Sequence, residues 1–418
     1  MLMQRFTRVA LRLFVGLACL PTTVRAAEAG TAADSDAPAL LDKLVKLARE
    51  RAPDVALGRA ALSASRSSYA SANLAPLGNP SLEVKADRGT QGVTKDITID
   101  ASLWLPVELS GQKQGRGREA RDYVRLHEAW LAQARAVATG RTVRAYGALA
   151  VATTRTRVLE EILAGARAES EHYAARLAAG DATERDAALA ALEAARHEVL
   201  LSETQRDVVH SAGELLDLTG WAHSEGSVLD ATMPGRRPRA PIAARDVRTP
   251  TTLALEEQAR YYGSAAERIR REAWAPLSLG LTGGRGDYGE ARFGAGVGYA
   301  FPVFRANQAE RARAEAERAR ALEELSLRQR LIARRIDLVE RELVAVARAI
   351  ELVTGSALPA ATRAVNAATE THRAGKGDWL SVLVSRRDLS ALSLRRLELL
   401  DKSWSLLGEL SELTGEVP

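Results

Sequence analysis

The sequence is poor in cysteine, which forms disulfides, and in the aromatic residues and methionine that fill a globular core. Its 418 residues include one cysteine, Cys19, so an intrachain disulfide is excluded. Aromatic residues make up 5%, and three methionines provide no path of thioether ligands for copper(I). No segment approaches the roughly 18 consecutive apolar residues of a membrane-spanning helix. These absences favour long helices with narrow seams, and they argue against a bundle of transmembrane helices.

The charges are numerous but nearly balanced. The chain carries 58 basic and 53 acidic residues, for a net charge of +5, and the two signs are interleaved throughout. Such interleaving is typical of solvated helix faces with ion pairs three or four residues apart. There is no zinc-finger or RNA-recognition pattern, and no basic patch is interleaved with aromatic residues. We therefore expect no nucleic-acid partner.

The N-terminus resembles a secretory signal peptide. Three arginines precede the apolar residues 13–20, and Ala26 supplies a small-residue cleavage site. We expect residues 1–26 to be removed and the mature chain to be exported. Ala18 leaves open a lipidated Cys19 as the alternative to its loss with the peptide.

The rest of the chain is a tandem duplication. Three anchors recur at a spacing of 195 or 196 residues, which is the signature of an internal repeat. They are Leu105-Pro106-Val107 with Phe301-Pro302-Val303, Gly180 with Gly375, and Gly220 with Gly415. The predicted domains are a first repeat over 27–220, a proline-rich linker over 221–250 and a second repeat over 251–418.

Each repeat is predicted to run helix, strand, strand, long helix, helix. The first begins with helical sequence over 39–74, and its strands lie within about 81–107. The strands of the second lie within about 277–303. Apolar residues alternate with small or polar ones at a period of 2, as in strands with one apolar face. The residues expected on the polar face include Thr98, Asp100, Ser102 and Arg292.

Such strands fit two architectures. They have the length and alternation of transmembrane barrel strands, apolar toward lipid and polar toward a lumen. Taken singly, they also fit half-buried hairpins of a soluble domain. Four strands cannot close a barrel, which takes at least about eight. Since lipid does not tolerate an open sheet edge, a membrane role requires an oligomer.

The predicted long helices cover 113–178 and 306–373. Apolar residues from Ile332 to Val353 follow a 4,3 spacing, and leucines from Leu392 to Leu413 recur every seventh residue. These spacings are typical of coiled-coil seams. The sequence thus predicts a mainly α protein with duplicated long coiled-coil hairpins and a small β part.

These features together resemble the TolC family of outer-membrane efflux channels over essentially the whole mature chain. The resemblance is carried by the duplication, the order of elements and the paired "LTG" segments that end at Gly220 and Gly415. The segment "LPVELSGQKQGRGREA", which starts at Leu105, is also similar to the cobalt–zinc–cadmium subgroup that serves heavy-metal pumps.

The resemblance implies a homotrimer with a shared twelve-stranded barrel in outer-membrane lipid and a periplasmic extension, in a Gram-negative envelope. It implies a periplasmic adaptor and an inner-membrane transporter, of the resistance–nodulation–division type. It places the adaptor contact and gate at the two hairpin tips. The matching positions are Gly180, Asp181, Asp186, Gly375, Lys376 and Asp378, while Thr98, Asp100, Ser102 and Arg292 would line the lumen.

No other pattern supports catalysis or a cofactor. The G-x-G-x-x-G segment at 284–289 leads into a strand, whereas dinucleotide binding needs a helix there. Glu193 and His197 could share a metal on one helix face, but a solvated pair fits them better. The sequence therefore predicts a passive exit channel, with heavy-metal cations as cargo. The alternatives are the same channel exporting drugs or proteins, and an exported coiled-coil scaffold without a pore.

Overall fold

A computed structural model describes most of both repeats. Asp34–Pro418 forms one compact unit. The predicted signal peptide 1–26 with Cys19, most of the predicted linker 221–250 and most of the 284–289 segment lie outside the described residues. The described residues are 37–72, 78–91, 94–223, 229–232, 248–285, 290–304 and 306–417, without the side chains of 37–39, 88–91 and 94–96.

The first repeat contains the helices α1 (Ala37–Arg51), α2 (Pro53–Ala72), α3 (Gln112–Ala178) and α4 (Glu184–Thr219). The single helix predicted over 39–74 is therefore two helices. Pro53 explains the break, since proline has no N–H to donate within a helix and is best accommodated at the first position of a new one.

The second repeat contains α5 (Pro250–Glu272), α6 (Gln308–Leu352), a π-helical turn η2 (Val353–Ala357), α7 (Leu358–Arg373) and α8 (Trp379–Thr414). The predicted long helix over 306–373 thus has one wide turn. Pro359 cannot donate the bond that a regular helix needs there, and the N–H of Leu358 instead donates to the carbonyl of Val353.

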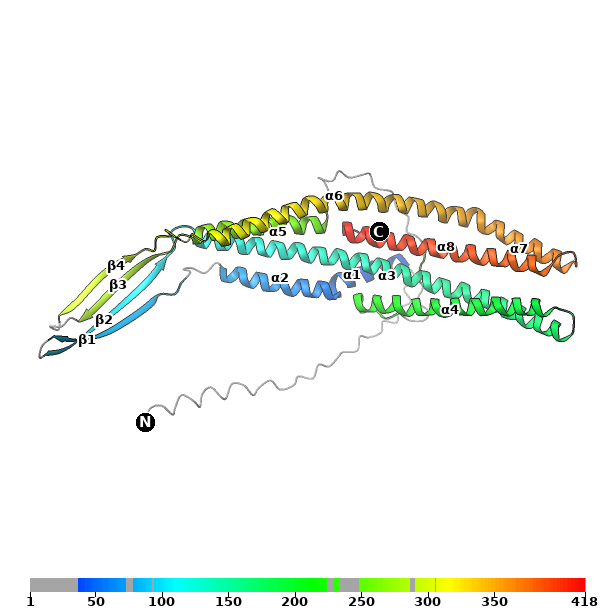
Figure 1. Ribbon diagram of the computed structural model, residues 1–418, viewed down its shortest axis with the longest axis horizontal. Helices are drawn as coiled ribbons and strands as arrows, with labels where there is room; N and C mark the ends of the chain where they lie inside the picture. The colour runs from blue at the N-terminus through cyan, green and yellow to red at the C-terminus, as the bar shows by residue number, and fades with distance from the viewer. Residues whose placement is uncertain are drawn as a thin grey trace, which may run out of the picture. The chain divides into compact units, whose positions relative to one another are not determined.

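Four strands form one antiparallel sheet in the order β1-β2-β3-β4 (Figure 1). They are β1 (Ser81–Gln91), β2 (Thr94–Val107), β3 (Leu277–Arg285) and β4 (Ala291–Gly298). The β2–β3 pairing joins the two repeats. The alternation in the sequence continues to Val303, whereas β4 ends at Gly298, because its partner β3 begins at Leu277.

The main core lies between α3 and the helices around it. In the described chain α3 packs against α2, α4, α5 and α8 (Figure 1). The predicted seam residues Ile332, Ile336, Val339 and Leu343 are buried in this core. Gly147 lets α3 and α8 approach closely, since a Cβ at that position would lie 2.2 Å from the ring of Trp404. The predicted helical seams therefore form the core that holds the hairpins together.

Candidate functional site

The sheet has one apolar face and one polar face. Register places Leu82, Leu103, Leu281 and Ala295 in one cross-strand row. The apolar face is uncovered in the single chain: Leu82 is 69% exposed and Phe293 is 90% exposed. Large apolar side chains in such number are not left in water without a reason. This face therefore needs an apolar partner outside the chain.

The polar face carries all four residues predicted for the lumen. Asp100 and Arg292 share a row with Lys85 and Gly284. Thr98 and Ser102 lie two residues away from Asp100 along β2. Gly284 makes room for the Asp100 carboxylate, since a Cβ there would lie 2.0 Å from its Oδ1.

Two ion pairs flank this charged row. Lys85 pairs with Glu83 at 3.2 Å, and Arg292 pairs with Glu290 at 2.5 Å. Both signs of charge are thus present, so the polar face suits water and ions without strong preference for one sign. The structure brings the four predicted residues onto one surface.

Trp104 is a residue of the polar face that the alternation did not single out. It occupies the position between Ser102 and Pro106, and its ring lies across the glycines of β3 and β4. A Cβ at Gly280 would lie 2.5 Å from this ring, and one at Gly296 would lie 3.2 Å from it. The glycines thus form a flat floor for the indole. Glycines at every second position of these strands were the one feature of the sequence that could have indicated a large ring packed against them.

The first hairpin tip, between α3 and α4, is a tight turn closed by backbone and side-chain bonds. Gly180 has φ 75°, and the N–H of Asp181 donates to the carbonyl of Arg176 at 2.8 Å. The backbone at this position is left-handed, which explains why the residue is glycine. Asp181 also pairs with Arg176 at 3.3 Å. The side chains of Thr183 and Asp186 form a reciprocal capping box at the start of α4, so the Asp186 carboxylate holds the turn.

The second tip, between α7 and α8, repeats this backbone. Gly375 has φ 73°, and the N–H of Lys376 donates to the carbonyl of Thr371 at 3.1 Å. Asp378 occupies the N-cap of α8 but makes no side-chain capping bond. Lys376 and Asp378 are exposed. The structure therefore places five of the six predicted tip residues in two similar turns, and Asp186 in the first turn of α4.

An aromatic contact joins the two tips. Tyr173 of α3 and Trp379 of α8 stack with ring centroids 4.5 Å apart, and both are buried with Val382 and Leu383. Burial is the largest influence on the Tyr173 hydroxyl and raises its pKa. Neither residue was predicted as part of the site. The two residues lie far apart in the sequence, so no local pattern indicated that they pair.

Ion pairs continue this connection along the hairpins. Arg386 of α8 pairs with Glu169 of α3, and Arg387 of α8 pairs with Glu193 of α4. Each pair therefore joins the two repeats. In each pair the arginine is 40% or 51% exposed, and pairs open to solvent contribute only about 0–1 kcal/mol, so the aromatic contact is the stronger link.

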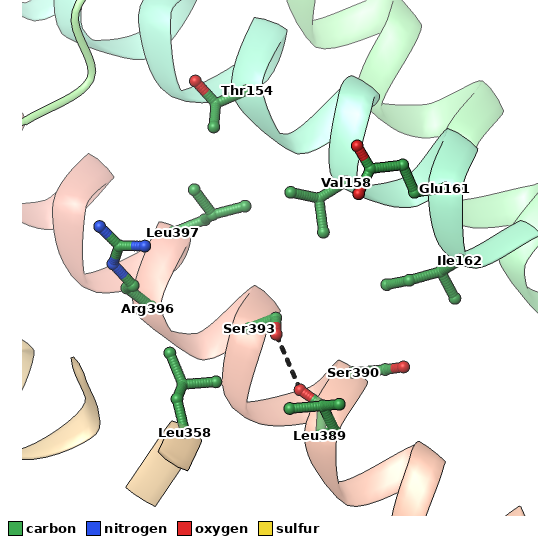
Figure 2. A pocket seen from close by; sticks show the side chains of 10 residues that line it. All are labelled: Thr154, Val158, Glu161, Ile162, Leu358, Leu389, Ser390, Ser393, Arg396 and Leu397. Atoms are coloured by element: carbon green, nitrogen blue, oxygen red, sulfur yellow. Dashed lines mark hydrogen bonds between the residues drawn. The ribbon is translucent and has the colours of Figure 1, made fainter. Parts of the chain in front are cut away.

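A cavity of about 310 Å³ separates α3 from α8 at the level of the π-helical turn (Figure 2). Leu358, the residue after that turn, faces Val158 and Ile162 of α3 and Leu389 of α8. Ser393 Oγ donates to the Leu389 carbonyl at 2.9 Å. Arg396 lines the cavity, and its buried Nε has no hydrogen-bond partner in the described chain. The hairpins are therefore less tightly packed here than at the tips.

The described residues contain no group of three or more His, Cys, Asp or Glu that could hold a metal ion. The Glu193–His197 pair is 4.0 Å apart, and Glu193 is also bound by Arg387. Burial is the largest influence on His197 and lowers its pKa, as it does for His127. The pair is therefore largely buried between helices, which corrects the sequence interpretation of a solvated pair.

By length and composition, Gln308–Arg373 could cross a membrane: an 18-residue window within it has a mean hydropathy of 1.4 and is 6% buried. The same run packs against α5 and α8. By these two criteria the run departs from the sequence expectation of no membrane-spanning helix, and part of its apolar surface forms the helix seam from Ile332 to Leu343.

Comparisons with known proteins point to one fold. No family model matches the chain. The cobalt-zinc-cadmium resistance protein CzcC of Cupriavidus metallidurans is 23% identical over 344 residues, which cover 81% of each protein. CusC, whose structures concern transmembrane channel formation, superposes with a TM-score of 0.74 at 14% identity and covers 90% of this chain and 92% of its own. The CmeC outer membrane channel of Campylobacter jejuni superposes with a TM-score of 0.73 at 15% identity and covers 89% and 84%.

The chain has the fold of the TolC-type outer-membrane channels, and the predicted fold class is confirmed. At 14–15% identity, the likeness to these two solved structures concerns the fold.

Proposed function

We propose that the protein is the outer-membrane channel of a tripartite efflux pump, a passive exit duct for heavy-metal cations. One observation carries the channel: a four-stranded sheet with an uncovered apolar face on one side and a face of charged and polar residues on the other. In a bilayer the first face would contact lipid, and the second would line water.

The open edges of this sheet support a trimer. Within the described chain, β1 and β4 each pair on one side only. Three copies would supply twelve strands and close the barrel, which lipid requires. The helices offer matching contact surfaces, since exposed apolar residues lie along both α4 and α6. They include Leu192, Val199 and Val209 on α4, and Leu331, Leu338 and Leu352 on α6.

The tips supply the surface for a periplasmic adaptor and an inner-membrane transporter. Their exposed Asp181, Lys376 and Asp378 are available for polar contacts. In this proposal Asp186 closes the entrance indirectly, because its carboxylate holds the first turn through Thr183.

Heavy-metal cargo is supported by the name of the curated relative CzcC. The lumen face adds carboxylates, at Asp100 and Glu83, that a passing cation would meet. Arg292 and Lys85 on the same face would serve anions equally, so drugs or proteins form the second cargo class to be tested.

Planar-bilayer recording of detergent-purified full-length protein, together with its mass, tests the channel. We expect discrete conductance steps from a trimer. A non-conducting soluble species would overturn the channel and leave an exported helical scaffold. Deletion of the gene should lower tolerance to cobalt, zinc or cadmium; unchanged metal tolerance with lower drug tolerance would overturn the metal cargo alone.

A further inference from the structure

Three helices meet around a group of arginines close to the sheet. A shallow cavity of about 280 Å³ is lined by Arg118 of α3, Arg260 of α5 and Arg318 of α6. Ser264 and Glu267 complete its polar lining. Two of the helices, α5 and α6, are held together here by Ala266, Ile269 and Ala314, which form a small buried cluster. The arginines are therefore presented by a packed scaffold.

The acidic residues near the cavity are already paired elsewhere. Glu267 accepts bonds from Arg270 and Arg271, each at 2.8 Å. Glu119, next to Arg118 in the chain, pairs with Arg268. On α6, Glu315 pairs with Arg311 at 2.8 Å, and Glu317 pairs with Arg320 at 3.7 Å.

Of the three arginines that line the cavity, Arg118 and Arg318 have positive charges that no carboxylate of the described residues balances. Arg260 is bound by Glu256 and Glu257. Arg118 and Arg318, by contrast, have no carboxylate within ion-pair distance among the residues that the structure describes. Two neighbouring guanidinium groups repel each other, so an anion between them would lower the energy of the arrangement.

A glycine directs one of these side chains. A Cβ at Gly263 would lie 3.4 Å from Nε and 3.6 Å from Cζ of Arg318. The guanidinium of Arg318 thus lies within ordinary van der Waals reach of this face of α5, which places it at the cavity.

The position of the cavity suggests the source of the anion. Arg118 lies within the first two turns of α3, which follows β2 closely, and Glu267 lies within the last two turns of α5, just before β3. At about 1.5 Å per residue, the cavity lies about 10–20 Å from the sheet. If the sheet crosses the outer membrane, as proposed above, this is the level of the periplasmic headgroups.

We propose that Arg118, Arg260 and Arg318 form a binding site for a phosphate group. Guanidinium groups match phosphate oxygens with paired N–H donors, and the charge makes these bonds stronger than neutral ones. The phosphate belongs either to an anionic phospholipid headgroup or to a free phosphate ester. Only the first source rests on the proposed membrane position.

The test uses full-length protein purified in detergent. The double variant R118A/R318A removes the unpaired charges. The control R313A/R330A removes the same charge from exposed positions on α6 that do not line the cavity. Native mass spectrometry would measure retention of phosphatidylglycerol against phosphatidylcholine, and calorimetry would measure binding of glycerol 3-phosphate and inorganic phosphate.

We expect R118A/R318A to bind the phosphate-bearing probe about tenfold more weakly or worse, because two charge-assisted contacts are lost, while the control is unchanged. Preference for phosphatidylglycerol supports a lipid site, and equal binding of the soluble phosphates supports a free-phosphate site. Binding that is equal in the site variant and the control overturns the proposal.

Conductance recorded on the same samples keeps the two proposals apart. A conducting wild-type channel without arginine-dependent phosphate binding would overturn the site alone. Arginine-dependent binding in a protein that never conducts would overturn the channel alone.

Discussion

The two hairpin tips have the same backbone but different supports. Gly180 and Gly375 adopt φ values of 75° and 73°, and each is followed by the same kind of backbone bond. The first tip adds a capping box through Asp186, whereas Asp378 of the second makes no side-chain capping bond. The turn thus requires only its glycine, and the repeats have diverged in the residues that stiffen it.

The long helices of the two repeats also differ in regularity. α3 runs for 67 residues without interruption, whereas the corresponding run of the second repeat contains a π-helical turn at Val353–Ala357. The cavity of Figure 2 lies beside that turn. The first hairpin thus has a regular long helix and the second an interrupted one, and Tyr173 and Trp379 join the two.

The largest expected effect comes from removing the contact between the tips. Trp379→Ala deletes a side chain that is 7% exposed and should cost about 3 kcal/mol of local stability. Amide hydrogen exchange should become faster in α7 and α8 but not in the middle of α3. The neighbour Leu380, 41% exposed, provides the control Leu380→Ala. Equal exchange in both variants would contradict the proposed link.

A smaller effect should separate the two tip aspartates. Asp186→Ala removes a capping box and should cost about 1 kcal/mol, whereas Asp378→Ala should change stability by less than about 0.5 kcal/mol. Chemical denaturation would measure both. Resting conductance should also rise in Asp186→Ala, because the first turn loosens. If both variants lose the same stability, the two tips are supported alike.

Acid should weaken the first repeat in particular. Burial lowers the pKa of His127 and of His197 below the ordinary value of 6.5, so the folded chain binds these protons less readily than the unfolded chain. The stability is complete above about pH 6.5 and is lost as pH falls toward the folded-state pKa values. The denaturation midpoint should therefore drop between about pH 7.5 and 5.5. His127→Gln and His197→Gln should each reduce that drop; a drop unchanged in both would assign it to other groups.

The smallest expected effect is a gain in stability at the π-helical turn. Nothing lies within 4 Å of a Cβ built at Gly355, and its φ is not in the left-handed region. Gly355→Ala should therefore stabilise the protein by about 0.5–1 kcal/mol through the unfolded chain. Thermal unfolding in detergent would measure it. A loss of stability would mean that the turn needs glycine for another reason.

The sequence predicted what depends on local periodicity. The alternation of β2 and the seam from Ile332 to Val353 have the faces that their spacing indicates, because period alone determines which side chains share a face. The glycines of the tips were likewise recognisable, since few other residues accept a positive φ. The early end of β4 was not predictable from its own residues, because it depends on where β3 begins.

The site was predicted less completely than the fold. The positions of Asp100 and Arg292 followed from alternation, but their common row depends on the register of three strand pairs. Trp104 was missed because its ring packs over glycines of β3 and β4, which lie far from it in the sequence. Tyr173 and Trp379 were missed because a pairing between distant segments has no trace in a single sequence.

The open edges of the sheet also affect how the protein folds and assembles. A lone copy exposes the hydrogen-bonding edges of β1 and β4, together with the apolar face of which Phe293 is the most exposed member. Such an edge is a template for any extended chain, so an unassembled copy is an aggregation hazard. The helical hairpins, in contrast, bury their seams within one chain. Folding of the hairpins can therefore precede assembly, whereas the strands reach a safe state only when neighbouring copies meet, and the time between these two events is when the chain most needs a chaperone.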